Sequence, residues 1–154
     1  MINTLELKVP PVAQVIVTAA AMYSVSKMTP SLKFFFNNST KLAVGLGAIG
    51  LGSGIMGVVQ FKKAQTTPNP QALEEVSSLV TSGIYRYSRN PMYVGLVFIL
   101  LGWALYLSHL LAFVWLPIFV LYMTRFQIWP EERAMKQKFG DAYQAYLTRV
   151  RRWI

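Results

Sequence analysis

The sequence predicts an all-α integral membrane protein with four transmembrane helices and an amphipathic interfacial helix at its carboxyl end. Only 14% of the 154 residues are charged, and the mean hydropathy is +0.39. The apolar residues gather into long uninterrupted runs, and the longest of these holds no Lys, Arg, Asp or Glu from Asn90 through Thr124. A chain of this length has room for one domain, so we expect residues 1–154 to form a single membrane domain.

The amino-terminal part contains two predicted spans, at residues 9–27 and 42–61. Each has an uncharged stretch about long enough to cross a hydrocarbon core of roughly 30 Å. Small residues recur in the second span at spacings of three, four and three, which places them on one helical face; they are Gly47, Gly50, Gly54 and Gly57. We expect this face to pack closely against another helix. The alternative is that Gly52-Ser53-Gly54 belongs to a cofactor pocket.

The apolar run from Asn90 to Thr124 predicts a helical hairpin. As one helix it would be about 50 Å long, which is too long for one crossing. Ser108-His109 is the only polar pair near its middle, so we place the turn there and the spans at residues 92–107 and 110–128. Pro91 suits the first helical position, and Asn90 before it is a natural cap.

Two polar segments complete the chain, a loop at residues 62–91 and a tail at 129–154. The amino end, this loop and the region at and beyond the end of the last span hold twelve of the fifteen Lys and Arg residues, whereas the opposite side holds three. By the positive-inside bias, both termini, the loop and the tail face the cytoplasm. We expect the tail to start a helix at Trp129-Pro130 and to break at residues 139–141. The amphipathic helix that follows should lie in the membrane surface, with Tyr143, Tyr146, Leu147 and Val150 on one face.

The composition excludes several kinds of site. There is no cysteine and only one histidine, His109, so we expect neither a disulfide framework nor a metal centre built on thiolates or imidazoles. We interpret His109 as part of the helix-helix turn rather than as a catalytic base. The net charge of +9 flanks the apolar runs instead of forming a soluble patch, which favours anionic lipid headgroups over nucleic acid.

Two cytoplasmic regions carry the residues best suited to chemistry. The stretch from Gly83 to Gly95 is rich in Arg, Tyr and Asn, and the tail begins with the pair Glu131-Glu132. Carboxylates bind amino groups or diols, arginines bind carboxylates, and tyrosine faces attract a sulfonium. The two regions therefore suit a zwitterionic cofactor. The alternatives are a basic-aromatic membrane anchor for the first region and helix capping for the second.

A resemblance narrows this choice. The string Leu79-Val80-Thr81-Ser82-Gly83-Ile84-Tyr85, then Arg89-Asn90-Pro91-Met92-Tyr93-Val94-Gly95, a hairpin, Glu131-Glu132 and Phe139-Gly140-Asp141-Ala142-Tyr143 resembles the isoprenylcysteine carboxyl methyltransferase and phospholipid methyltransferase superfamily. The resemblance covers about residues 60 to 152. It implies an integral membrane enzyme that moves a methyl group from S-adenosylmethionine to a lipophilic acceptor. The cofactor-binding residues that it implies are Ser78, Leu79, Val80, Tyr85, Asn90, Pro91, Met92, Tyr93 and Glu131.

The chain also departs from the eukaryotic carboxyl methyltransferases. They have Arg-His-Pro where this chain has Arg89-Asn90-Pro91, and a substrate-directed arginine where it has Gln127. These departures put recognition of a prenylated cysteine carboxylate in doubt. We predict Arg89 and Glu132 as catalytic residues, with Glu132 or a water taking the proton from an ammonium acceptor.

The acceptor class stays open among an isoprenylcysteine-type carboxylate, a lipid amine and a small thiol. The expected partners are therefore the membrane and a lipid or small lipophilic molecule; the sequence does not indicate an oligomeric state. The competing functions are a membrane scaffold and a four-helix transporter. A transporter usually needs an ionisable residue within a span, and the four predicted spans have none away from their ends.

Overall fold

The fold is known from a computed structural model of the chain, which describes residues 6–67, 69 and 75–154. These residues form helices and connecting segments with no β-strand; one isolated bridge joins Lys33 and His109. The long helices are α1 (Pro11–Met28), α2 (Ser39–Lys63), α3 (Pro91–Leu107), α4 (Leu110–Tyr122) and α5 (Trp129–Arg149). Short helical segments are η1 (Pro30–Leu32), η3 (Gly83–Arg86) and η4 (Met123–Ile128), of which η4 is a π-helix.

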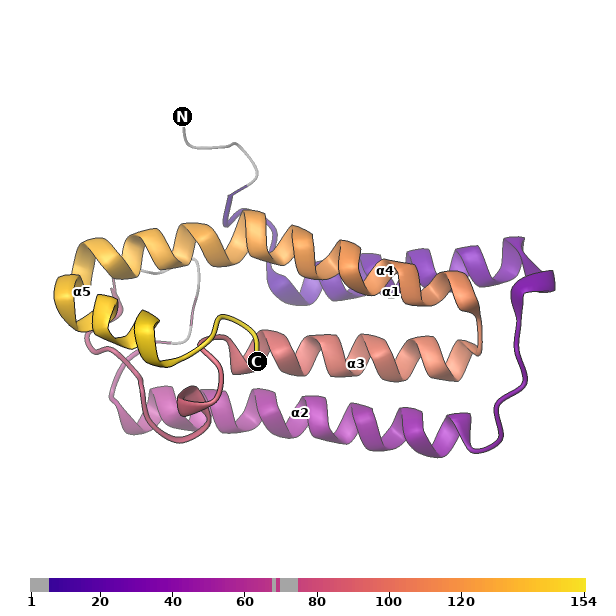
Figure 1. Ribbon diagram of the computed structural model, residues 1–154, viewed down its shortest axis with the longest axis horizontal. Coiled ribbons are helices and arrows are strands. Elements are labelled where there is room, and N and C mark those ends of the chain that lie inside the picture. The colour runs from indigo at the N-terminus through magenta and orange to yellow at the C-terminus, as the bar shows by residue number, and fades with distance from the viewer. Residues whose placement is uncertain (1–5, 68, 70–74) are drawn as a thin grey trace.

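The helices form an elongated bundle in which α3 lies between two other layers (Figure 1). α2 packs chiefly against α3, whereas α1 packs against α4 and α3. The core joins side chains of α1, α3 and α4 and of the start of η4, among them Met22, Leu100, Phe119 and Met123. Large apolar side chains such as Ile16, Ile55 and Leu121 remain exposed on the outside of the bundle. This inverted surface is what a lipid environment requires.

The predicted spans agree with the helices to within a few residues, but their membrane crossing is supported unequally. Two helical segments are long and apolar enough to span a membrane, α2 and the segment Leu110–Arg149. α3 is apolar but shorter, with 17 residues. The all-helical fold and the membrane character are thus supported, and the crossing of the bilayer by four helices stays a prediction.

Only some of the predicted small-residue face serves helix packing. A Cβ atom added at Gly50 would lie 2.5 Å from the carbonyl oxygen of Gly95, and one at Gly57 would lie 2.4 Å from a side-chain carbon of Met92. The backbones of α2 and α3 therefore approach so closely at Gly50 that only glycine fits there, whereas Gly57 packs against the Met92 side chain of α3. Gly47 and Gly54, by contrast, have nothing within 4 Å of that position. The expectation of four packing glycines was wrong for these two.

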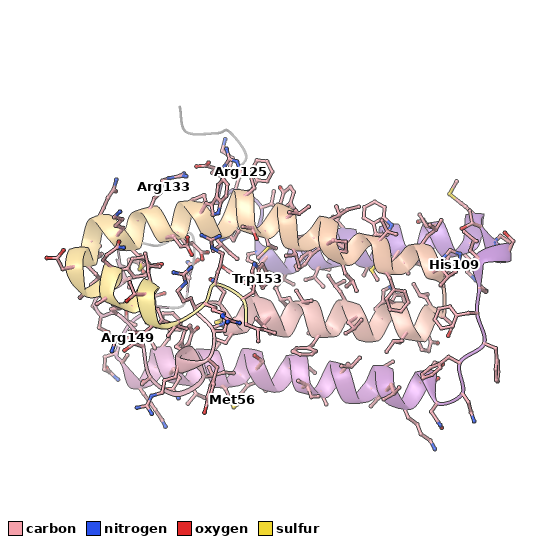
Figure 2. All side chains as sticks on the ribbon, in the orientation of Figure 1. Met56, His109, Arg125, Arg133, Arg149 and Trp153 are labelled. Atoms are coloured by element: carbon pink, nitrogen blue, oxygen red, sulfur yellow. The ribbon has the colours of Figure 1, made fainter. Side chains whose placement is uncertain are left out.

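The predicted turn at residues 108–109 is confirmed. Ser108 ends α3 with φ 48°, and His109 immediately precedes α4. The fully buried His109 ring places Nε2 2.7 Å from the carbonyl oxygen of Thr29 and 3.1 Å from its hydroxyl. The imidazole therefore ties the α3-α4 turn to the end of α1. Figure 2 shows His109 at one end of the bundle and Trp153 nearer the other.

The sequence suggests that the tail starts a new helix at Trp129, and this expectation was wrong. The helix runs from α4 through η4 into α5 without interruption. Pro130 explains the wider π-helical turns before it, because proline has no N–H for the Phe126 carbonyl four residues earlier and its ring crowds that position. The apolar part of this helix ends at Ile128. The stretch from Leu110 to Phe139, before the chain reverses at Gly140, is about 45 Å long at 1.5 Å per residue, longer than a hydrocarbon core of roughly 30 Å, so the first half of α5 continues beyond the apolar layer.

The break predicted at residues 139–141 is confirmed, but the helix after it faces differently from our expectation. Gly140 has φ 50° and ψ −124°, a conformation that glycine adopts without strain, and the chain reverses there. The reversed half of α5 buries Tyr143 and Tyr146, at 5% and 4% exposure, against the rest of the protein. The aromatic face that we expected to contact the membrane surface is therefore covered by this chain's own residues.

Candidate active site

One cavity lies where the loop after α2, the start of α3 and the two halves of α5 meet. Its volume is about 340 Å³. The wall combines residues from α1, α2, α3 and α5 with the segment that precedes α3. They are Pro11, Val12, Gly54, Phe61, Thr67, Asn69, Val76, Ser78, Leu79, Val80, Tyr85, Arg89, Asn90, Met92, Tyr93, Leu96, Glu131, Glu132, Met135, Tyr143 and Tyr146.

Glu131 is the centre of the polar part of this cavity. Its Oε1 accepts a hydrogen bond from the hydroxyl of Tyr93 at 2.5 Å and another from Nε2 of Gln127 at 2.6 Å. Gln127 and Glu131 are four residues apart, so they lie on one face of the helix, and that face points at the first turn of α3. Within the described chain, no Lys, Arg or His forms an ion pair with Glu131.

Burial changes the proton affinity of the Glu131 carboxyl. Glu131 lies beyond the apolar part of its helix, yet removal from water raises its pKa to about 7, against the opposing influence of the hydrogen bonds from Tyr93 and Gln127. The nearby Glu132 carboxylate adds to the rise. A carboxyl in this state exchanges its proton near neutral pH and gains most from a cationic ligand.

Glu132 has the opposite environment. Its Oε1 lies 3.0 Å from a terminal nitrogen of Arg89, and Arg152 donates to both of its oxygens, at 2.9 and 2.7 Å. Two guanidinium groups therefore hold this carboxylate from two sides. The Arg89 side chain is only 11% exposed, and its Nε has no hydrogen-bond partner among the described residues. This arrangement favours Glu132 as the residue that orients Arg89, and its role as a base stays a prediction.

The residues after α5, 150–154, form a segment that we call the carboxyl-terminal strap. The amide of Arg89 donates to the carbonyl of Arg151 at 3.0 Å, and Nδ2 of Asn90 donates to the carbonyl of Arg152 at 2.9 Å. Trp153 donates to the hydroxyl of Thr124 at 3.1 Å. The strap is thus bonded to the start of α3 and to η4, and it holds Arg89 and Asn90, which line the cavity.

Aromatic rings from the middle and from the carboxyl-terminal part of the chain line the same cavity. The Tyr146 hydroxyl donates to the carbonyl of Tyr85 at 2.7 Å, and the Tyr85 ring meets that of Phe61 edge-on with centroids 5.4 Å apart. Burial raises the pKa of Tyr146 to about 12, so its hydroxyl is neutral at physiological pH. These rings offer neutral, electron-rich faces to a ligand.

The structure brings nearly all of the predicted site residues together. Every one of them lines the cavity except Pro91, which is buried at the start of α3 and whose carbonyl accepts a hydrogen bond from Ser53 at 2.6 Å. Pro91 opens α3 as predicted, but the expectation that the Asn90 side chain caps the helix was wrong, because it makes no capping bond and binds the strap instead. Of the acidic pair at 74–75, Glu75 is exposed and Glu74 lies outside the described residues.

Other wall residues were not predicted from the sequence. Tyr143 and Tyr146 were assigned to a membrane-facing helix, and only the reversal at Gly140 turns them inward. Gly54 was assigned to helix packing but lines the cavity, as the alternative interpretation of Gly52-Ser53-Gly54 had allowed for that residue. No group of three His, Cys, Asp or Glu residues that could hold a metal ion occurs in the described residues.

Comparisons with known proteins show which family the chain resembles. Residues 38–142 match the model of the family described as phospholipid methyltransferase. The chain is 31% identical over 126 residues to a protein-S-isoprenylcysteine O-methyltransferase of Schizosaccharomyces pombe, covering 79% of this chain and 52% of that one. It is 34% identical over 100 residues to the mouse delta(14)-sterol reductase TM7SF2, covering 58% of this chain and 23% of that one.

A third relative is an uncharacterized protein of Haemophilus influenzae, which is 46% identical over 63 residues, covering 41% of this chain and all of that one. The chain thus spans about half of the methyltransferase and about a quarter of the reductase. No solved structure matches the chain significantly. The family match covers more than half of the chain, from the start of α2 to just beyond Gly140, and includes most of the residues that line the cavity. The chain therefore belongs to the phospholipid methyltransferase family, within the superfamily that also contains the isoprenylcysteine methyltransferases.

Proposed function

We propose that this protein is an integral membrane methyltransferase that binds S-adenosylmethionine in the cavity and moves its methyl group to a lipophilic acceptor. The observation that carries the proposal is Glu131, a buried carboxylate with two neutral donors and no cationic partner among the described residues. A buried charge without a partner is costly. A cationic ligand offsets that cost, and the cofactor carries both an ammonium and a sulfonium group.

The rest of the cavity supports the same ligand. Its volume of about 340 Å³ lies in the range of roughly 300–1,000 Å³ that is usual for small-ligand sites. Tyrosine rings beside Glu131 suit a sulfonium through cation-π attraction. The free Nε of Arg89 supplies a donor for the carboxylate end. We propose Ser78, Leu79, Val80, Tyr85, Asn90, Met92, Tyr93 and Glu131 as the wall around the cofactor, with Pro91 fixing the start of α3.

The bound cofactor would supply an activated methyl group, and the residues of this chain then align, desolvate and support the transfer. The strap holds Arg89 and Asn90 through its backbone carbonyls, and the ion pair of Arg89 and Glu132 lies in the cavity wall. An ammonium acceptor must lose a proton before attack, whereas a carboxylate or thiolate arrives ready. Glu132 is the candidate base for the first case; because its oxygens are held by guanidinium groups, a water is the alternative.

The acceptor side of the cavity is apolar. Pro11 and Val12 of α1 and Gly54 of α2 line it together with Met92 and Leu96 of α3, and α1 and α2 do not pack extensively on each other. Val12 is 64% exposed on the outer surface, so this wall continues to the lipid-facing side. We infer that the acceptor is a lipid or small lipophilic molecule that enters sideways from the bilayer.

The membrane arrangement completes the proposal. We propose one domain over residues 1–154 with four crossing helices, both termini in the cytoplasm and the cavity on the cytoplasmic face. In the bundle, the loop before α3, the start of α1 and the tail lie at one end, and the α3-α4 turn lies at the other (Figure 1). The distribution of Lys and Arg supports the same topology, because the positive-inside bias assigns the segments with most of these residues to the cytoplasm.

Calorimetric titration of the purified protein with S-adenosylmethionine tests the proposal. Saturable binding is expected, with weaker binding of S-adenosylhomocysteine because its sulfur is uncharged. A scaffold or transporter would show no such binding, and this result would overturn the proposed function. A mass-spectrometric screen of lipid and small-thiol extracts with isotope-labelled methyl donor then identifies the acceptor, and labelling of proteins alone would contradict the lipophilic class.

The apolar side has its own test. A Cβ atom at Gly54 meets nothing within 4 Å, so Gly54→Val should fold while filling part of the cavity. We expect it to slow methyl transfer to the lipophilic acceptor more than it weakens cofactor binding. Gly52→Val is the matched control, because Gly52 is equally open and does not line the cavity. Equal effects of the two substitutions on transfer would contradict this acceptor side.

A further inference from the structure

The segment before α1 bonds to a backbone carbonyl that has lost its usual partner within the helix formed by η4 and α5. Pro130 has no N–H to donate to the carbonyl of Phe126, and the amide of Leu7 donates to that oxygen instead at 3.0 Å. Leu7 adopts φ 58°, a left-handed conformation that a leucine takes only when its surroundings hold it there. The amino-terminal segment is therefore fitted to the irregular part of the helix.

Glu6 strengthens this attachment with two ion pairs. Its Oε1 lies 2.7 Å from Arg125, and its Oε2 accepts a short hydrogen bond from Arg133. The Glu6 side chain is only 6% exposed, and the hydrogen bond from Arg125 is the main reason why its pKa lies below the usual value. Arg125 in turn lies over the rings of Phe126 and Trp129, at 5.3 and 5.6 Å from their centroids. Figure 2 shows Arg125 and Arg133 on the outer side of the long helix.

The two arginines are eight residues apart, so Glu6 bridges two successive turns of the helix. Between them in the sequence lie Gln127 and Glu131, whose side chains point to the inner side and bond to each other. The outer contacts thus hold the same two turns whose inner side carries the polar centre of the cavity. A π-helix is wider and less regular than an α-helix. Contacts on the outer side of this helix therefore influence the direction in which the Gln127 side chain points.

We propose that Glu6 is a positioning residue for the cavity: by bridging Arg125 and Arg133 it fixes the two helical turns that carry Gln127 and Glu131. The proposal rests on the proposed function insofar as Glu131 binds the cofactor. Glu6 itself is absent from the cavity wall and acts through Glu131.

The experiment compares Glu6→Gln, which keeps the size of the side chain and removes both ion pairs, with Glu6→Asp, which keeps the charge. Lys8→Gln is the matched control, since Lys8 is exposed in the same segment. Without any ligand, hydrogen exchange of residues 123–131 should become faster in Glu6→Gln only. The affinity for S-adenosylmethionine should fall roughly fivefold or more in Glu6→Gln, as for coupled neighbours, with partial recovery in Glu6→Asp.

A double variant separates positioning from general stability. If Glu6 acts through Glu131, Glu6→Gln added to Glu131→Gln should weaken binding no further, whereas an independent effect would add to the first. Unchanged exchange and unchanged affinity in Glu6→Gln, or full additivity in the double variant, would overturn the proposal. If the parent protein itself does not bind the cofactor, the proposed function fails, and the exchange measurement still decides whether Glu6 holds the two turns.

Discussion

Replacing Glu131 by glutamine removes one charge from the cavity and leaves its shape unchanged. In the structure, one oxygen of Glu131 accepts both bonds, from Tyr93 and Gln127, and the carbonyl oxygen of a glutamine accepts the same two. Glu131→Gln should therefore fold normally. Its effect on binding then reports the attraction between the carboxylate and a cationic ligand.

The magnitude follows from Coulomb's law. Two unit charges about 4 Å apart attract by about 4 kcal/mol at an effective dielectric constant of about 20. Desolvation of the ligand charge offsets part of this attraction, which leaves about 2–4 kcal/mol, or roughly a thirtyfold to thousandfold loss of affinity. Calorimetric titration with S-adenosylmethionine at pH 8 measures that loss. Glu75→Gln is the control, because the exposed Glu75 carboxylate should contribute little.

The pH dependence has a defined sign. Because burial raises the pKa of Glu131 to about 7, protons compete with the cationic ligand as the pH falls through neutrality. The parent protein should lose affinity below pH of about 7, whereas Glu131→Gln should not, so their difference shrinks in acid. Equal affinity of the two proteins at pH 8 would refute the reasoning, and a difference that stays constant down to pH 5 would contradict the raised pKa.

Three further predictions concern the frame of the site. The chain has no native cysteine, so single cysteines can be introduced at Phe35 and Tyr87, which are 94% and 79% exposed. An impermeant reagent should label the cysteine at position 35 from the outside and the one at position 87 from the cytoplasm. Labelling of both from one side would contradict the four-span topology. Gly50→Ala should lower thermal stability by about 1–3 kcal/mol, since its Cβ meets a backbone oxygen at 2.5 Å, whereas Gly47→Ala should not; similar melting temperatures would argue against the close α2-α3 contact. Arg152→Gln removes the two bonds to Glu132 and should weaken cofactor binding about tenfold, and unchanged affinity would mean that Arg152 does not position Glu132 for the cofactor.

The helices could be predicted from the sequence because each is marked by local chemistry. The polar pair Ser108-His109 interrupts a long apolar run, and Pro91 can only begin a helix where its missing N–H costs nothing. The chemical region was found in a similar way, since Arg89 and Glu131 are conspicuous beside uncharged spans. Such signals lie within a few residues of the feature that they predict.

The remainder depends on contacts between residues that are far apart in the sequence. The Asn90 side chain suits a helix cap, yet it binds the carbonyl of Arg152, 62 positions later. Similarly, the spacing of Tyr143 and Tyr146 shows that they share a helical face but not what covers that face. The π-helical turns were not predicted either, because Pro130 was interpreted as a helix start and not as the cause of irregular turns before it.

The pairing of α1 with α4 rather than with α2 has a consequence for biogenesis. When the ribosome has delivered α1, α2 and α3 to the membrane, the neighbours α2 and α3 can already join, but α1 still lacks the helix that buries Met22 against Phe119 and Met123. Only the last-made third of the chain supplies that partner, together with the arginine that meets Glu6. During insertion, α1 therefore lacks part of its packing surface until α4 has been made. A nascent chain stalled before residue 110 should expose α1 to quality-control proteases.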